Sequence, residues 1–133
     1  MSAPQQNKKV LVYGTLRPGN RAYSLFELDE QTQHLGTVRI PGSMYHLGGF
    51  PGVKLDGSQP GVVCDVLEIL NPDVMSLLDH YEGYNEDNPR ASLYIRREVD
   101  TPEFGPCLVY EFNNDVQQRP KMEDGDWNRR ATG

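Results

Sequence analysis

The chain has 133 residues, of which 37% are hydrophobic and 24% charged, so it fits one globular domain with a single compact core. Acidic residues outnumber basic ones by 19 to 13, and no cluster of Lys and Arg could neutralise phosphates, which disfavours nucleic acid as a partner. No segment is apolar enough for a signal peptide or for a membrane span of about 20 residues, so we expect a cytoplasmic protein with no membrane partner.

Both ends of the chain are polar and lack hydrophobic periodicity. Residues 1–8 are expected to form a flexible N-terminal segment, and residues 113–133 a polar C-terminal tail held by few contacts. The predicted domain therefore spans residues 9–112. No pattern in the chain predicts an oligomeric state.

Between these ends, short apolar runs rich in β-branched residues alternate with Gly and Pro, a pattern typical of strands. In chain order we expect a strand at 10–13, a short helix after Asn20, strands at 36–40, 43–47 and 61–69, a helix at 72–82, and strands at 93–99 and 107–112. The last two strands are spaced as a hairpin. So many short strands favour a curled sheet or a barrel, because closure removes exposed strand edges.

The helix at 72–82 is the best defined of these elements. Asn71 can cap it, Pro72 suits its first position, and Gly83 can end it in a left-handed conformation. Its apolar residues recur with helical spacing and predict a buried stripe made of Val74, Leu77, Leu78 and Tyr81.

The cysteines and histidines do not suggest a metal site. Cys64 and Cys107 lie in strand-like runs, which favours buried, reduced side chains over a disulfide or a catalytic thiol. His34, His46 and His80 lack the short paired spacing of zinc ligands, so no metal is expected.

The first segment that could carry chemistry is the turn Tyr13-Gly14-Thr15-Leu16, where an apolar strand stops at a glycine. If the turn is concave, its backbone N–H groups form a nest for a carboxylate or an oxyanion, and Thr15 adds a hydroxyl. A plain exit from a strand into a loop is the alternative interpretation.

The second such segment is the end of the predicted helix. A carboxylate there lies at the negative pole of the helix dipole, so partial burial would raise the pKa of Glu82 and suit it to proton transfer near neutral pH. Asp79 and His80 qualify on the same grounds, and a solvated helix end is the alternative.

An ordered set of motifs resembles the gamma-glutamylcyclotransferase-like family. Val12-Tyr13-Gly14-Thr15-Leu16-Arg17 is similar to the family's strand-and-turn signature, and Leu78-Asp79-His80-Tyr81-Glu82-Gly83-Tyr84 to its second signature. Tyr94-Ile95-Arg96, Val109-Tyr110 and Gly125-Asp126-Trp127 resemble further family motifs in the expected order. Together they cover roughly residues 9–127, which makes the resemblance more specific than any single motif.

The resemblance implies an α+β fold, a small mixed β-barrel with one or two short helices and a pocket at one mouth. It implies substrate contacts from Tyr13, Gly14, Thr15 and Leu16, an acid and base role for Glu82, and a supporting role at the helix end for Asp79 and His80.

The reaction implied is the conversion of a small γ-glutamyl amine, amide or peptide into 5-oxoproline and a free amine. Glu82 would move the proton in both steps, so neither a metal nor a cofactor is expected. The long, polar loop at residues 85–92 departs from the pattern and bears on the leaving group. Phe50-Pro51-Gly52 has two interpretations, an apolar pocket wall or ordinary turn packing.

Two other functions remain as alternatives. One is an enzyme that removes a γ-glutamyl protecting group during biosynthesis or repair, which differs only in the rest of the substrate. The other is a non-catalytic module that binds a ligand or partner on the same barrel, because a fold alone does not prove turnover.

Overall fold

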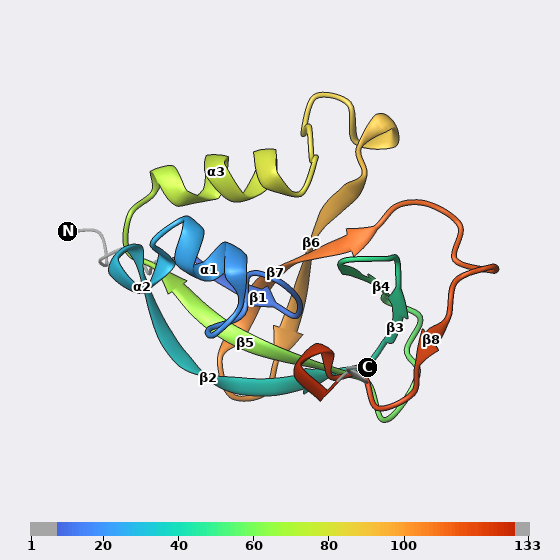
Figure 1. Ribbon diagram of the computed structural model, residues 1–133. Coiled ribbons are helices and arrows are strands. Elements are labelled where there is room, and N and C mark those ends of the chain that lie inside the picture. The colour runs from blue at the N-terminus through green and yellow to red at the C-terminus, as the bar shows by residue number, and fades with distance from the viewer. Residues whose placement is uncertain (1–7, 130–133) are drawn as a thin grey trace.

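The computed structural model of the protein describes residues 8–129 (Figure 1). The segment expected at residues 1–8 therefore lies outside the described residues, apart from Lys8. The strands are β1 (Lys9–Val12), β2 (Thr32–Ile40), β3 (Ser43–His46), β4 (Pro51–Lys54), β5 (Val62–Ile69), β6 (Tyr94–Thr101), β7 (Gly105–Phe112) and β8 (Lys121–Met122). The helices are α1 (Arg21–Leu25), α2 (Leu28–Gln31) and α3 (Asp73–Tyr81), with 3₁₀ turns η1 (Pro89–Ala91) and η2 (Trp127–Arg129).

The main sheet has five strands in the order β2-β5-β1-β7-β6, and β1 lies at its centre. Strand β1 runs parallel to β7 and antiparallel to β5. Its side chains alternate between two hydrophobic clusters: Val10 and Val12 pack on the face that α1, α2 and α3 cover, and Leu11 packs on the other. Both faces of β1 are therefore buried from Val10 onward, which explains the apolar run Val10-Leu11-Val12.

The α+β class is confirmed, but the strands do not close into the expected barrel. Strands β4, β3 and β8 form a separate sheet, in that order. Strand β4 meets the main sheet through side chains instead of a backbone ladder: Lys54 Nζ donates to the carbonyl of Phe112 (2.8 Å), and Tyr94 Oη donates to that of Pro51 (2.7 Å). The junction needed for closure is thus made by side chains, and the main sheet keeps open edges at β2 and β6.

The six predicted strands all occur, with ends shifted by a few residues, and two further strands were missed. Strands β6 and β7 form the predicted hairpin, where Thr101 pairs with Gly105. Strand β4 begins at Pro51-Gly52, which the sequence marks as a break, because proline is tolerated as the first residue of a strand. Strand β8 has only 2 residues and is too short for a periodic pattern.

Helix α3 matches the predicted helix to within a residue at each end. The side chain of Asn71 accepts a hydrogen bond from the N–H of Asp73 (3.2 Å), and Gly83 ends the helix at φ 68°. The buried residues are Val74, Met75 and Leu78. Of the predicted stripe, Leu77 is only half-buried and Tyr81 is 38% exposed, and Met75 is buried instead.

The polar segment from residue 113 onward contacts the rest of the protein more than its composition predicts. Strand β8 pairs with β3, Trp127 is only 2% exposed, and the carboxylate of Asp126 lies 2.7 Å from Nη1 of Arg17. These contacts, contrary to the expectation of few, join residues 121–129 to the domain. Residues 130–133 lie outside the described part.

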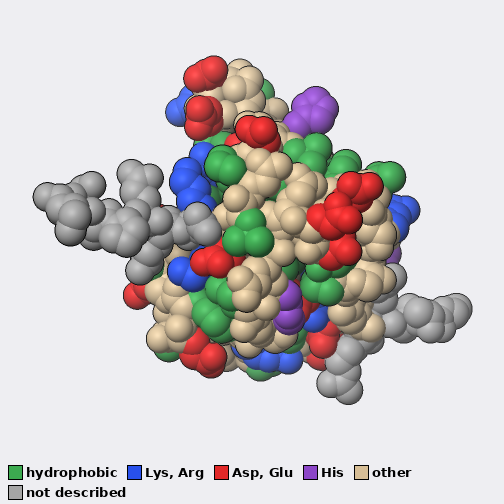
Figure 2. Space-filling view, turned by 90° about the vertical axis from the view of Figure 1, so that its left-hand side faces the viewer, with side chains coloured by type: hydrophobic (Ala, Val, Ile, Leu, Met, Phe, Trp, Pro, Cys, Tyr) green, Lys and Arg blue, Asp and Glu red, His purple; other side chains and the backbone are tan. Residues whose placement is uncertain are grey.

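On the face shown in Figure 2, acidic and basic side chains are interspersed, and no large basic patch is visible. None of the helices within residues 8–129 is long and apolar enough to cross a membrane.

Candidate active site

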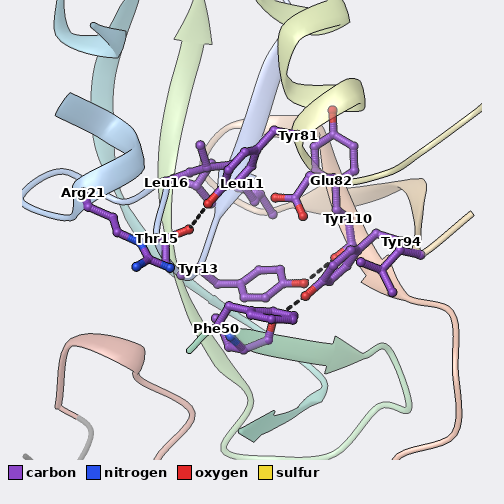
Figure 3. Close-up of a pocket in the computed structure, with 14 residues that line it drawn as sticks. Leu11, Tyr13, Thr15, Leu16, Arg21, Phe50, Tyr81, Glu82, Tyr94 and Tyr110 are labelled. Carbon is purple, nitrogen blue, oxygen red and sulfur yellow. Dashed lines mark hydrogen bonds between the residues drawn. The ribbon is translucent and has the colours of Figure 1, made fainter. Parts of the chain in front are cut away.

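A cavity of about 240 Å³ lies where the turn after β1, the C-terminal end of α3 and the start of β4 meet (Figure 3). Its walls come from Leu11, Val12, Tyr13, Gly14, Thr15, Leu16, Arg21, Phe50, Pro51, Tyr81, Glu82, Leu93, Tyr94 and Tyr110. The structure therefore brings together all five residues that the sequence put forward as site residues, from two segments almost 70 positions apart.

The turn after β1 is fixed through its carbonyl groups. The carbonyl of Gly14 accepts from the N–H of Arg17 (3.0 Å), and that of Thr15 accepts from the N–H of Ala22 (3.1 Å). The N–H groups of Gly14, Thr15 and Leu16 donate to no other backbone group of residues 8–129. Three successive donors are thus available along the cavity wall, as an anion-binding nest requires.

Only glycine fits at position 14, because the ring of Pro51 packs against it. An added Cβ would lie 2.6 Å from Cγ of Pro51, so any other residue would push the turn and β4 apart. Phe50 and Pro51 line the cavity, which supports their interpretation as an apolar wall.

A hydrogen bond joins the turn to the helix end. The hydroxyl oxygens of Thr15 and Tyr81 are 2.8 Å apart across the cavity wall. The Tyr81 ring also packs edge-on against Phe26, with centroids 5.1 Å apart. Tyr81 therefore points towards the cavity instead of into the core, which explains its exposure.

Glu82 is the C-terminal capping residue of α3, and its carboxylate points into the cavity (Figure 3). The side chain is partly buried, and the cavity walls shield it from bulk solvent although it can be reached from the cavity itself. This burial raises the pKa of Glu82 from 4.5 to about 8. The direction of this shift is the one predicted from the sequence for a partly buried Glu82.

Three tyrosines surround Glu82, and each donates its hydroxyl proton elsewhere. Tyr13 donates to the carbonyl of Tyr110, Tyr94 to the carbonyl of Pro51, and Tyr110 to Asp79 Oδ1 (2.6 Å). Burial is the main cause that raises the pKa of all three phenols; Asp79 raises that of Tyr110 further, and the charge of Glu82 contributes to all three. The tyrosines therefore stay neutral, and none of their hydroxyl groups donates to Glu82. Within the described residues, no hydrogen bond to the Glu82 carboxylate offsets the free-energy cost of burying its charge.

Asp79 supports the helix end, as the resemblance implies. Besides Tyr110, its carboxylate accepts a hydrogen bond from Nη1 of Arg96 (2.7 Å) on β6. The guanidinium of Arg96 stacks over the ring of Tyr84, 5.2 Å from its centroid. His80 is exposed and makes no such contact within residues 8–129.

Several functional features escaped the sequence-based reasoning. Arg21 lines the cavity, and nothing in the sequence distinguishes it from other polar residues of the loop. No residue of the 85–92 loop lines the cavity, but Leu93, which follows it, does.

Cys64 and Cys107 are buried free thiols, and neither lines the cavity. Within residues 8–129, no group of three His, Cys, Asp or Glu side chains is placed to hold a metal ion.

Comparisons with known proteins identify similar folds and a matching family. Three similar solved structures are the uncharacterized protein PH0828 from Pyrococcus horikoshii (TM-score 0.67, 21% identity, 91% of this chain and 90% of that one), the protein ytfP from Escherichia coli (0.66, 26%, 91% and 96%), and an AIG2-like protein from Mus musculus (0.64, 19%, 90% and 88%). No curated protein matches the chain. The family described as gamma-glutamyl cyclotransferase, AIG2-like, matches residues 10–129. Because this match covers nearly the whole chain, the protein belongs to the AIG2-like gamma-glutamyl cyclotransferase family.

Proposed function

We propose that the protein converts a small γ-glutamyl amine, amide or peptide into 5-oxoproline and a free amine, with Glu82 as the general base and then the general acid. One observation carries this proposal: the carboxylate of Glu82, with its raised pKa, lies in the cavity that is also lined by the turn whose N–H groups have no backbone acceptor. Membership of a cyclotransferase family supports it.

The reaction is intramolecular. The α-amine of the γ-glutamyl group attacks its own γ-carbonyl carbon, a C–N bond closes the five-membered ring, and the C–N bond to the leaving amine breaks. Both reacting groups belong to one molecule, so the cavity has only to hold the folded conformer, and such positioning can contribute several kcal/mol.

One carboxylate can balance the protons. The α-nitrogen changes from an ammonium with three protons to a lactam N–H with one, so two protons leave it. Ionised Glu82 takes the first proton, which makes the amine nucleophilic, and releases it to solvent. It then takes the second proton as the C–N bond forms and returns that proton to the nitrogen that leaves. The pKa of Glu82 near 8 is close to the value of about 8 for a terminal α-amino group, so the exchange costs little in either direction.

The turn supplies the complementary contacts. We assign substrate binding to Tyr13, Gly14, Thr15 and Leu16. The free N–H groups from Gly14 to Leu16 would bind the α-carboxylate or the oxyanion of the tetrahedral intermediate. Thr15 is held in place by its hydrogen bond to Tyr81.

A panel of γ-glutamyl amines, amides and peptides tests the proposal, with 5-oxoproline as the measured product. We expect turnover by the wild type and a loss of at least about 100-fold in kcat for Glu82→Gln, which retains the shape but cannot accept a proton. Glu98→Gln is the matched control, because Glu98 is exposed on β6 and lies outside the cavity.

The outcomes separate the alternatives. Equal rates for the wild type and Glu82→Gln would reject the role of Glu82. Binding of γ-glutamyl compounds without any product from the wild type would favour the non-catalytic module. Turnover to 5-oxoproline confined to one class of leaving amine would favour an enzyme that removes a γ-glutamyl protecting group over a general cyclotransferase.

A further inference from the structure

The cavity contains one cationic and one anionic side chain. Arg21 is the only Lys or Arg among its described wall residues, and Glu82 is the only Asp or Glu. Figure 3 shows Arg21 and Glu82 on opposite sides of the cavity, with Thr15 between them. A substrate bound against Glu82 therefore shares the cavity with a positively charged side chain.

The guanidinium of Arg21 is not committed to the protein. Within residues 8–129 it forms no ion pair and no hydrogen bond, whereas Arg17, four positions earlier, pairs with both Asp65 (2.6 Å) and Asp126 (2.7 Å). The start of α1 is nevertheless anchored to the turn, because the N–H of Ala22 donates to the carbonyl of Thr15. Arg21 is thus held beside the turn with its donors available.

A γ-glutamyl compound offers one carboxylate on its glutamyl half, and the free N–H groups of the turn can bind it. A second anion-binding group, such as Arg21, then finds no further carboxylate on the glutamyl half. Arg21 is exposed, whereas Glu82, where the ring closes, is partly buried, so Arg21 lies towards the side from which the leaving group projects.

We propose that Arg21 binds a carboxylate on the leaving group, so that the preferred substrates are γ-glutamyl α-amino acids and not γ-glutamyl amines. This inference rests on the function proposed above and names the substrate class. Two partly exposed apolar side chains of the cavity wall, Phe50 (37% exposed) and Leu93 (42%), would contact an apolar side chain of that amino acid.

Two matched probes test the inference. γ-Glutamyl-leucine and γ-glutamyl-3-methylbutylamide share one carbon skeleton and differ only in the leaving-group carboxylate. We expect the wild type to prefer the leucine compound, and Arg21→Gln to lower the ratio of the two kcat/KM values about fivefold to tenfold, mainly through KM. Arg21→Lys should restore part of the ratio, because it keeps the charge and loses the planar fork.

Arg90→Gln is the control, since it removes the same charge from the exposed 3₁₀ turn η1, outside the cavity. An equal fall in kcat/KM for both probes would place Arg21 on the glutamyl half and overturn the inference. An unchanged ratio would overturn it as well.

Binding separates this inference from the proposed function. Calorimetry on Glu82→Gln and on the double variant with Arg21→Gln measures the affinity for both probes without turnover. If the wild type forms no 5-oxoproline, the proposed function fails, but a selective loss of affinity for γ-glutamyl-leucine would still support the contact. Equal affinities for both probes in the two variants would reject it.

Discussion

Glu82 is in surroundings that disfavour its charge, and this has a consequence for stability. The folded protein holds the proton of Glu82 up to about pH 8, whereas an ordinary glutamate ionises near 4.5. Because the folded state binds this proton more tightly than the unfolded chain, its favourable contribution to the free energy of unfolding is fully present below pH 4.5. It is lost as the pH rises towards 8.

We therefore predict that Glu82→Gln is more stable than the wild type at pH 8.5, by roughly 1 to 4 kcal/mol, and about equally stable at pH 4.5. Urea unfolding of both proteins at the two pH values measures the difference. Glu98→Gln, which changes an exposed glutamate, should show no such pH dependence. A constant difference between Glu82→Gln and the wild type from pH 4.5 to 8.5 would show that burial does not perturb Glu82.

At the level of elements, the end of α3 is held against the sheet by Asp79, which accepts from Arg96 on β6 and from Tyr110 on β7. Glu82 follows three residues later on the same helix end. The position of the proposed base therefore depends on contacts of Asp79, which does not itself line the cavity.

For Asp79→Asn we predict a loss of about 1 to 3 kcal/mol in stability, because the amide no longer offers a charged acceptor to both donors. We also expect kcat to fall about tenfold with little change in KM, since Glu82 shifts while the turn stays in place. Steady-state kinetics with a γ-glutamyl probe and urea unfolding check both effects. His80→Gln is the control, because His80 is adjacent and exposed; a kcat for Asp79→Asn equal to that of this control would exclude the positioning role.

The elements that local patterns determine were predicted well. Strand β1 is apolar from Val10 onward because both its faces are buried there. Helix α3 is bounded by Asn71 and Gly83, whose conformations are local. Strand β8 was missed because it exists only through its pairing with β3, a long-range contact without a local signal. The open edge at β2 was missed for the same reason.

The candidate site follows the same division. The turn after β1 and Glu82 could be proposed from the sequence because each lies in a recognisable motif, and the order of the motifs joined them. The contact between Thr15 and Tyr81, the tyrosines around Glu82 and the place of Arg21 all arise from tertiary packing. The expected cytoplasmic location and the lack of a nucleic-acid partner stay predictions.

At the scale of the whole molecule, Arg17 joins the turn after β1 to two distant parts of the chain. Its side chain is buried, and it joins Asp65 on β5 to Asp126, which precedes the buried Trp127. Trp127 packs beside His46, with ring centroids 5.3 Å apart, on the face of the sheet away from the helices. The ion pair thus holds the C-terminal segment closed over one of the two hydrophobic clusters.

Trp127 is the only tryptophan, so its fluorescence reports on this segment alone, while far-UV circular dichroism reports on the whole fold. For the wild type we predict coincident urea transitions by both signals. Asp126→Asn leaves Arg17 with one carboxylate and weakens the segment by about 1 to 3 kcal/mol, so its fluorescence should change at lower urea concentration than its dichroism. Glu123→Gln, an exposed change of the same charge on the same segment, should keep the two transitions together. If the transitions also coincide in Asp126→Asn, the segment and the sheet unfold as one unit, because the packing of Trp127 and the pairing of β8 with β3 then suffice without the ion pair.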